Sequence, residues 1–574
     1  MNVGELQQKL SRWAEQDQER KFYGLLKLIS QVEWLRLAHD HVARNRGSVT
    51  AGCDGIIMKT FDEKLEENLQ ALSVELRSGT FEPYPVRRVV LYVRKADGRI
   101  KHRPLGIPAI RDRIVQEAIR MALEPIFEAD FSQDSFGFRP GRCTMDAIKR
   151  VYQVAHNNRK YFWCVEGDIA SCFDTIGHRK LLKLLRRRIK DEKLIDLIWQ
   201  FLRAGVMEGK LFRDTSQGVP QGGILSPLLS NVYLHELDRY MQAKYTAFTA
   251  AQRRARRKKG LANVVYARYA DDFVAMTNGT KAQAEAVKED LYRFLKKRLR
   301  LRLSKQKTKV THVNEGFDFL GYRIVRKRSG RGERVAHLVI PDKAWRQIRH
   351  KINVATNPGT HRDSVATKIT ALNRLVRGWC NYYRYTSHAT TDFRRLNHLL
   401  FWRMAHWLGR KYKLRMPAVM RRFRKGNTFA TATHALMIPT SIKTKRYLKP
   451  CKKPNPYTAT DRPSLERETV FQLPNWTGAE WRPGRADLRW QVLERDGYRC
   501  RFSGHPVSPA TAHVDHIKPR SRFKRPESAD CLENLQTLHV EVHQEKTQLE
   551  RQMESRDARK RARPVRRGVS GDGA

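Results

Sequence analysis

The spacing of hydrophobic residues divides the N-terminal half of the chain into a helical and a mixed region. Apolar residues between Phe22 and Leu37 recur at i, i+3 and i+4, and residues 1–80 as a whole are predicted to be helical. From about 85 to 325, β-branched runs alternate with helical stretches, which is typical of an α+β domain rather than a regular parallel sheet. Strands are predicted there at 86–93 and 264–276, and amphipathic helices at 180–202 and 282–301.

The C-terminal half changes character twice. Residues 340–425 have helical spacing and are rich in Arg, Trp and Tyr, whereas the stretch from about 430 to 480 is rich in Pro and Lys. A last compact unit then precedes a basic tail that is predicted to be disordered. The predicted division is 1–84, 85–325, 326–428, 429–484 (a basic linker or DNA-binding segment), 485–552 and 553–574 (the tail).

The charge of the chain indicates a large polyanionic partner. Lys and Arg number 112 against 59 Asp and Glu, a formal net charge of +53 over 574 residues. Such an imbalance repels itself in the free protein and is best explained by phosphates that the basic residues neutralise. No stretch approaches the roughly 20 apolar residues of a membrane-spanning helix, and the N-terminus lacks the apolar core of a signal peptide. The eight scattered cysteines suggest reduced thiols, so we expect a bacterial cytoplasm or nucleoid and no membrane.

Clustered acids stand out in so basic a chain. Asp271 and Asp272 lie between two apolar β-rich runs, which predicts a hairpin with both carboxylates at its turn. Alone, this would be an ordinary turn, but a second apolar run, residues 161–174, carries Asp168 near its end. Three carboxylates delivered from neighbouring strand ends can hold two Mg²⁺ ions, one activating a primer 3′-hydroxyl and both neutralising charge on the reacting phosphate.

An ordered series of sequence blocks makes the chain resemble the reverse transcriptases encoded in bacterial group II introns. The blocks that carry the resemblance are 47–56, 103–108 after Lys95, 135–141, 168–174, 217–227, 269–272, 304–308 and 319–322. The resemblance implies an α+β multidomain protein with a right-hand polymerase fold. Residues 1–84 would be a helical extension of the fingers, 85–325 the fingers and palm, and 326–428 an α-helical thumb and maturase domain.

The resemblance also implies roles for single residues. Asp168, Asp271 and Asp272 match the metal-binding triad, and the carbonyl of Ile169 would be a further ligand. Residues that match contacts to the incoming deoxynucleoside triphosphate are Phe173 (excluding a ribose 2′-hydroxyl), Gln221 (near the sugar), and Lys95 and Arg103 (gripping the triphosphate). Without the resemblance, Phe173 would be a core aromatic and Lys95 a solvated turn lysine.

The helical region 340–425 resembles the thumb and maturase region that holds intron RNA. Its Arg and Lys interleave with Trp and Tyr in residues 372–388 and beyond, a pattern that suits phosphate contacts and stacking on unpaired bases. The same pattern is typical of a helical bundle with an aromatic core, and for Trp379 and Tyr383 we expect the core.

The unit at 485–552 resembles ββα-metal (HNH) nucleases. By that resemblance Asp515 and His543 would bind one divalent metal, His516 would take a proton from water, and Asn534 would orient His516. The family's two zinc-binding Cys-x-x-Cys pairs are incomplete, since Ser503, His539 and Val542 stand at three of the four positions. Cys500 and His539, with Cys531 or His505, would be the remaining ligands. Lone Cys and His residues are more often simply packed in a core, so we do not expect a structural zinc.

The sequence therefore predicts a three-activity intron protein. It would bind its intron RNA to assist splicing, nick target DNA and extend the freed 3′-hydroxyl with deoxynucleoside triphosphates. Two alternatives remain open, a domesticated reverse transcriptase in defence or repair and an RNA-binding maturase that only assists splicing.

Overall fold

The computed structural model divides the chain into two compact units, Met1–Gln472 and Leu473–Ala574, which are described separately. The described residues of the first unit are 2–94, 100–156, 160–208, 211–213, 217–220, 222–304, 308–328, 333–445 and 454–458. Those of the second are 492, 496, 500–501, 512–516 and 534–539. No helix within these ranges is long and apolar enough to cross a bilayer.

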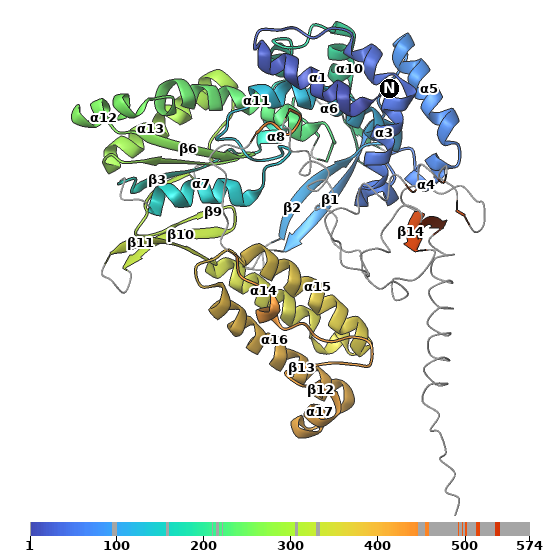
Figure 1. Ribbon diagram of the computed structural model, residues 1–574, viewed down its shortest axis with the longest axis vertical. Helices are drawn as coiled ribbons and strands as arrows, with labels where there is room; N and C mark the ends of the chain where they lie inside the picture. The colour runs from blue at the N-terminus through green and yellow to red at the C-terminus, as the bar shows by residue number, and fades with distance from the viewer. Residues whose placement is uncertain are drawn as a thin grey trace, which may run out of the picture. The chain divides into compact units, whose positions relative to one another are not determined.

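Three N-terminal helices pack against one buried helix, α6 (Ile110–Asp130) (Figure 1). They are α1 (Val3–Gln16), α2 (Leu25–Ile29) and α3 (Val32–Ala43). Outside them, α5 (Leu65–Ser78) packs on α2 and α3, and α4 (Met58–Asp62) packs on α5. The fully buried Trp34 of α3 donates its indole N–H to the Ala118 carbonyl of α6 at 3.0 Å. The predicted helical character of this region is confirmed, but the chain breaks at Ser30, so residues 22–37 do not form one helix.

A four-stranded sheet follows, in the order β2-β1-β4-β5. Its strands are β1 (Val86–Arg94), β2 (Ile100–Ile107), β4 (Val206–Glu208) and β5 (Leu211–Arg213). The strand predicted at 86–93 is confirmed as β1, which pairs with β2 so that Leu91 lies opposite Arg103. Lys95 falls in the connection between the two strands, outside the described residues.

The central sheet is antiparallel, in the order β6-β7-β3-β8. Its strands are β3 (Trp163–Asp168), β6 (Val264–Tyr269), β7 (Asp272–Thr277) and β8 (Lys309–His312). Side chains alternate between two cores: Tyr266 and Phe273 belong to one, and Val265 and Val274 to the other. The sheet is therefore buried on both faces, which explains why β6 and β7 are almost wholly apolar runs.

Helices cover both faces of the central sheet (Figure 1). They include α7 (Thr144–His156) on one face and α13 (Lys281–Phe294) on the other, with α8 (Cys172–Thr175), α11 (Ser226–Met241) and α12 (Ala250–Lys258) in the same unit. The helix predicted at 180–202 is in fact two, α9 (His178–Leu185) and α10 (Glu192–Arg203). Asp191 separates them because its carboxylate accepts the Leu194 amide at 3.2 Å and caps α10.

A three-stranded sheet leads into a helical bundle. The strands are β9 (Phe317–Phe319), β10 (Tyr322–Arg328) and β11 (Arg334–Val339), and the helices are α14 (Asp342–Ala355), α15 (Val365–Tyr383), α16 (Ala389–Tyr412) and α17 (Met416–Phe423). Tyr322 is fully buried and bonds the Tyr382 carbonyl of α15, while the Tyr383 hydroxyl donates to the Gly321 carbonyl at 3.0 Å. The sheet and the bundle thus share one core. The short strands β12 (Arg424–Lys425) and β13 (Thr428–Phe429) extend that core past residue 428, with Phe429 fully buried.

Residues 454–458 lie against the N-terminal helices. The Tyr457 hydroxyl donates to Glu124 of α6 at 2.6 Å, and the ring is 9% exposed. The Asn455 amide donates to Ser11 at 2.8 Å and to Glu15 at 2.7 Å, both on α1. Part of the predicted linker is therefore an ordered strap over α1 and α6.

In the second unit the structure describes one antiparallel strand pair. β14 (Ala512–His516) pairs with β15 (Leu535–His539), which places Asp515 opposite Gln536 and His516 opposite Leu535. Asn534, directly before β15, is 8% exposed. The side chains of Asp515 and His516, and all of His543, lie outside what the structure describes.

Candidate active site on the central sheet

The central sheet brings the three predicted aspartates to one edge. Asp168 ends β3, Asp272 begins β7, and these two residues face each other in the antiparallel register. Asp271 precedes Asp272 in the tight turn after β6, where Tyr269 pairs with Asp272. All three residues are half-buried.

The turn that carries Asp271 has an unusual backbone and a close neighbour. Ala270 adopts a left-handed conformation (φ 56°), which disfavours a side chain and must be held by its surroundings. Gly137 packs directly on this turn: a Cβ there would lie 3.0 Å from the Tyr269 carbonyl carbon and 3.2 Å from the Ala270 Cα, and closer still to the Ala270 nitrogen. The block 135–141 therefore packs directly against the backbone of the turn that carries Asp271.

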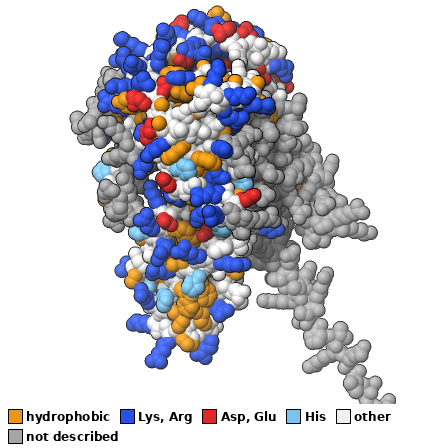
Figure 2. Space-filling model, turned by 90° about the vertical axis from the view of Figure 1, so that its left-hand side faces the viewer, with side chains coloured by type: hydrophobic (Ala, Val, Ile, Leu, Met, Phe, Trp, Pro, Cys, Tyr) orange, Lys and Arg blue, Asp and Glu red, His pale blue; other side chains and the backbone are white. Residues whose placement is uncertain are grey.

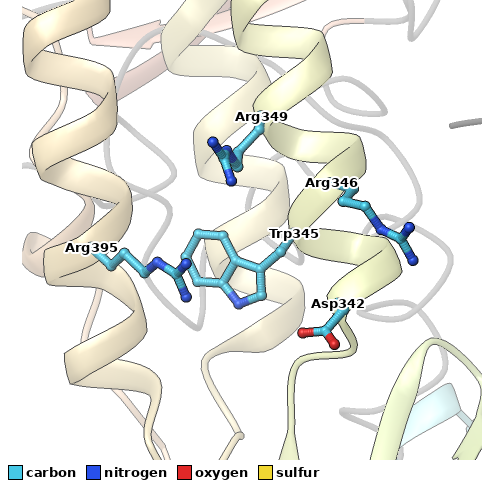
Figure 3. Close-up of a pocket in the computed structure, with 5 residues that line it drawn as sticks. All are labelled: Asp342, Trp345, Arg346, Arg349 and Arg395. Atoms are coloured by element: carbon cyan, nitrogen blue, oxygen red, sulfur yellow. The ribbon is translucent and has the colours of Figure 1, made fainter.

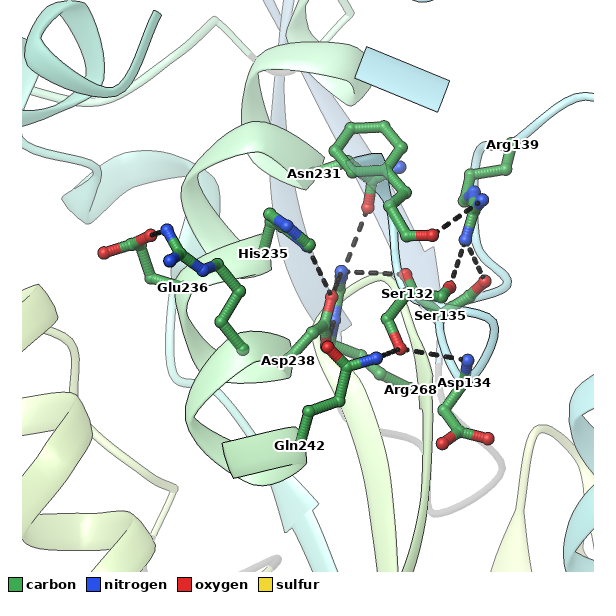
Figure 4. A network of polar contacts seen from close by, with 12 residues as sticks. Ser132, Asp134, Ser135, Arg139, Asn231, His235, Glu236, Asp238, Gln242 and Arg268 are labelled. Atoms are coloured by element: carbon green, nitrogen blue, oxygen red, sulfur yellow. Dashed lines mark hydrogen bonds and ion pairs between the residues drawn. The ribbon is translucent and has the colours of Figure 1, made fainter. Parts of the chain in front are cut away.

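A fully buried arginine ties this turn to the neighbouring elements (Figure 4). Arg268, in β6, makes two hydrogen bonds to Asp238 of α11, at 2.8 and 2.6 Å. Its remaining donors reach the Ala270 carbonyl at 3.0 Å, the Ser135 hydroxyl at 2.8 Å and Asn231 at 3.2 Å. The guanidinium thus holds the turn, the 135–141 block and α11 in one arrangement.

Arg268 and Asp238 remain charged although both are buried, because each is hydrogen-bonded to the other. Burial favours the neutral acid, but the charge and hydrogen bonds of Arg268 outweigh it and hold the pKa of Asp238 below its usual range. Asn231 adds a second link, because its amide donates to the Gly137 carbonyl at 2.8 Å. Removing one partner of such a pair strongly destabilises the folded protein, because the other charge is left buried and unpaired.

The strand end at Asp168 is fixed by the segment that precedes β8. The Asp168 carbonyl accepts the Ser304 amide at 2.8 Å, and the Ala170 amide donates to the Arg302 carbonyl at 2.9 Å. Ile169, between them, is 1% exposed and forms a β-bridge with Leu303. Its backbone is therefore held beside the triad, as a carbonyl ligand would require.

Phe173 lies on α8, just beyond the β3 strand end. Its ring is half-buried and meets Phe138 edge-on, with centroids 6.3 Å apart. Its carbonyl accepts the Val219 amide at 2.7 Å, which joins α8 to the 217–227 block. In that block, Gly218 (φ 94°) approaches the Asp174 backbone so closely that a Cβ would lie 2.9 Å from its carbonyl oxygen. The block is thus built against the same corner as Phe173.

Other predicted residues are not described at the level of side chains. Gln221 lies outside the described residues, and for Arg103 only the backbone in β2 is described. Among the residues that the structure describes, no three His, Cys, Asp or Glu side chains already form a metal-binding cluster. The three aspartates share one sheet edge. Their oxygen donors still suit magnesium, which prefers carboxylate ligands.

The sequence analysis missed Arg268 and its partners. The signal was present, because Arg268 is the one charged residue inside the apolar run Val264–Tyr269. An arginine within a strand buried on both faces requires an acidic partner, but the sequence alone does not show that Asp238 is that partner.

Comparisons with known proteins match this architecture. Residues 93–324 match the family model for reverse transcriptase (RNA-dependent DNA polymerase), and residues 345–425 match the group II intron maturase-specific domain. The group II intron-encoded protein LtrA of Lactococcus lactis subsp. cremoris is 30% identical over 93% of this chain and 97% of its own length. Protein YkfC of Escherichia coli (strain K12) is 44% identical over 60% of this chain and 94% of its own length. Nuclear intron maturase 2, mitochondrial, of Arabidopsis thaliana is 29% identical over 38% of each chain.

Proposed function

The chain belongs to the family of group II intron-encoded proteins, which combine a reverse transcriptase with a maturase domain, and from this premise we propose a DNA-synthesising ribonucleoprotein. It binds its intron RNA to assist splicing, and it copies that RNA into DNA from a primer in the target. The placement of Asp168, Asp271 and Asp272 at one edge of the central sheet carries the polymerase assignment.

In this proposal each group near the triad has a defined task. Asp168, Asp271 and Asp272 hold Mg²⁺, with the Ile169 carbonyl as a further ligand, and the ions supply charge neutralisation at the primer hydroxyl and the phosphate. Phe173 bounds the deoxyribose of the incoming nucleotide and excludes a 2′-hydroxyl. Lys95 and Arg103 grip the triphosphate, and Gln221 contacts its sugar side.

Primer extension on an RNA template with deoxynucleoside triphosphates tests the polymerase. We expect Mg²⁺-dependent product with the wild type, and none with Asp271→Asn, which keeps the size of the side chain but removes a charged ligand. Asp174→Asn is the matched control, because Asp174 is an exposed acid near the site that has no proposed ligand role. Wild-type protein that binds intron RNA without making product would instead favour the splicing-only maturase. Extension without any affinity for intron RNA would favour the domesticated enzyme.

We further propose that the C-terminal unit nicks target DNA to provide the primer. Asp515 and His543 would bind one divalent metal, His516 would deprotonate water, and Asn534 would orient His516. The antiparallel pairing of β14 with β15 supports this, because it brings His516 opposite Leu535, directly after Asn534. His516→Ala should abolish nicking and leave cDNA synthesis on a supplied primer unchanged. Equal loss of both activities would contradict separate sites.

A further inference from the structure

The helical bundle exposes a basic surface with very few acids. Residues 342–425 contain 20 Lys and Arg against three Asp and no Glu. In the lower part of Figure 2, Lys and Arg side chains of the bundle surround a small hydrophobic patch with histidines beside it. Such a surface suits a partner that offers both phosphates and flat apolar groups.

The first part of this surface is a shallow pocket between α14 and α16, called the hollow below. It has a volume of about 410 Å³ and is lined by Asp342, Trp345, Arg346, Arg349 and Arg395. Figure 3 shows Arg349 and Arg395 flanking the Trp345 indole, and the Arg395 guanidinium carbon lies 5.0 Å from the ring centroid. Trp345 is 9% exposed and packs on Trp379, so the floor of the hollow is rigid.

The arginines of the hollow are available to a ligand. Across the described ranges Arg346, Arg349 and Arg395 form no ion pair, although Asp342 lies at the edge of the same hollow and Asp392 lies near enough to Arg395 for the two charges to interact. A planar guanidinium with unused donors is suited to phosphate oxygens, which it can bind with two parallel hydrogen bonds.

The second part is an aromatic ridge along α16. Trp402 is 39% exposed, and His398 and His406, one turn before and after it, are exposed as well. The Trp402 indole N–H donates to the His398 ring at 3.1 Å, and the His406 ring lies 6.2 Å from the Trp402 ring. The two histidines therefore border an indole of which more than a third of the surface is exposed to solvent.

The α16 residues of the ridge and of the hollow lie on the same face of that helix. Positions 395, 398, 402, 406 and 410 lie on one face of an α-helix and span about 22 Å along its axis. Arg395 closes one end and the exposed Arg410 the other. We call this face, with Trp345 and Arg349, the α16 track.

We propose that the α16 track binds an unpaired RNA segment, with one base stacked on Trp402 and backbone phosphates held by Arg349 and Arg395. An unpaired segment fits better than a duplex, because bases of a duplex are already stacked and offer no free face to an exposed indole. The inference rests on the proposed function, since it names the part of the intron RNA that the bundle recognises.

Fluorescence anisotropy of the full chain with a labelled 12-nucleotide single-stranded RNA tests the track, with a 12-base-pair RNA duplex as the second probe. We expect Trp402→Ala to weaken single-strand binding roughly 5- to 150-fold, the range for one lost base stack, and Trp402→Phe to retain most of it. Duplex binding should change little. Trp13→Ala is the matched control, because Trp13 is 38% exposed on α1, away from the bundle.

The salt dependence separates the two kinds of contact. Arg349→Ala with Arg395→Ala should reduce the slope of log affinity against log salt by about 0.7 for each phosphate lost, whereas Trp402→Ala should leave the slope unchanged. Single-strand binding by Trp402→Ala equal to that of Trp13→Ala would overturn the proposal and leave the ridge to a protein partner. Equal weakening for both probes would also overturn it. Primer extension by the same wild-type preparation shows whether the proposed function itself stands.

Discussion

Gly137 gives the sharpest test of how the aspartate turn is held. A methyl group at this position would overlap the Ala270 backbone, with the Tyr269 carbonyl carbon at 3.0 Å and the Ala270 Cα at 3.2 Å, where ordinary contact begins at 3.4 Å. The Ala270 nitrogen would lie nearer still, roughly 1 Å inside that limit. All three atoms belong to the backbone and none to a flexible side chain, so the backbone itself must move by roughly 1 Å to restore normal packing. Because Asp271 follows Ala270 directly, Gly137→Ala should displace a triad carboxylate.

The expected effect is large on rate and moderate on stability. A misplacement of about 1 Å at a reacting centre lowers the rate roughly 100-fold, or about 2.7 kcal/mol of activation free energy. Overpacking a well-filled site costs about 1–3 kcal/mol in folding free energy, so the variant should still fold.

Single-turnover primer extension on an RNA template, run beside a thermal unfolding scan, measures both quantities. Gly177→Ala is the control, because a methyl there would meet only the Tyr233 hydroxyl at 3.8 Å, and it should extend primers at the wild-type rate. A Gly137→Ala protein that extends primers at the wild-type rate would refute the role of this contact in placing Asp271.

Three further predictions concern buried polar groups. Asp238→Ala should lower the free energy of unfolding by about 3–5 kcal/mol by leaving Arg268 unpaired, and Asp238→Leu with Arg268→Met should lose less, as denaturant titration of all variants would show. Burial disfavours a charged His39, but the hydrogen bonds that its ring donates to Asp40 and Asp62 outweigh burial and raise the pKa of His39 to about 9. The stabilisation from His39 is complete below pH 6.5 and is lost as the pH rises through 9. The difference in melting temperature between wild type and His39→Gln should therefore shrink from pH 6.5 to 10, and a constant difference would contradict this pKa. Tyr457→Phe removes a buried hydrogen bond worth about 1–3 kcal/mol, so limited proteolysis should cut the strap faster than in the wild type.

Period and composition were enough to predict most of the main elements and to single out Asp168, Asp271 and Asp272 as acids at strand ends. The apolar runs on either side of Asp271 and Asp272 predicted the β6–β7 hairpin, because a strand buried on both faces is nearly continuous in hydrophobic residues. The sequence predicted that these acids lie at neighbouring strand ends, but the register that sets Asp168 against Asp272 comes only from the structure, since strand pairing across about 100 residues leaves no local mark.

Elements with mixed or polar composition were not predicted. β10 and β11 carry basic residues along their solvent side, so 326–340 was included with the helical region. The strap at 454–458 lies in a Pro- and Lys-rich stretch whose composition indicates a linker, and only the fold supplies the Glu124 partner that buries Tyr457. In both cases tertiary contacts override a local pattern.

The strap gives the first unit a second connection between its helical bundle and its N-terminal helices, held at each end by hydrogen bonds. The Lys445 amide bonds the Arg384 carbonyl at the bundle, and ten residues later Asn455 is held on α1. Ten residues reach at most about 35 Å when fully extended, so the contacts of Lys445 and Asn455 can lie no farther apart than that. While both contacts hold, the helical bundle can move away from the N-terminal helices only as far as this length of chain allows.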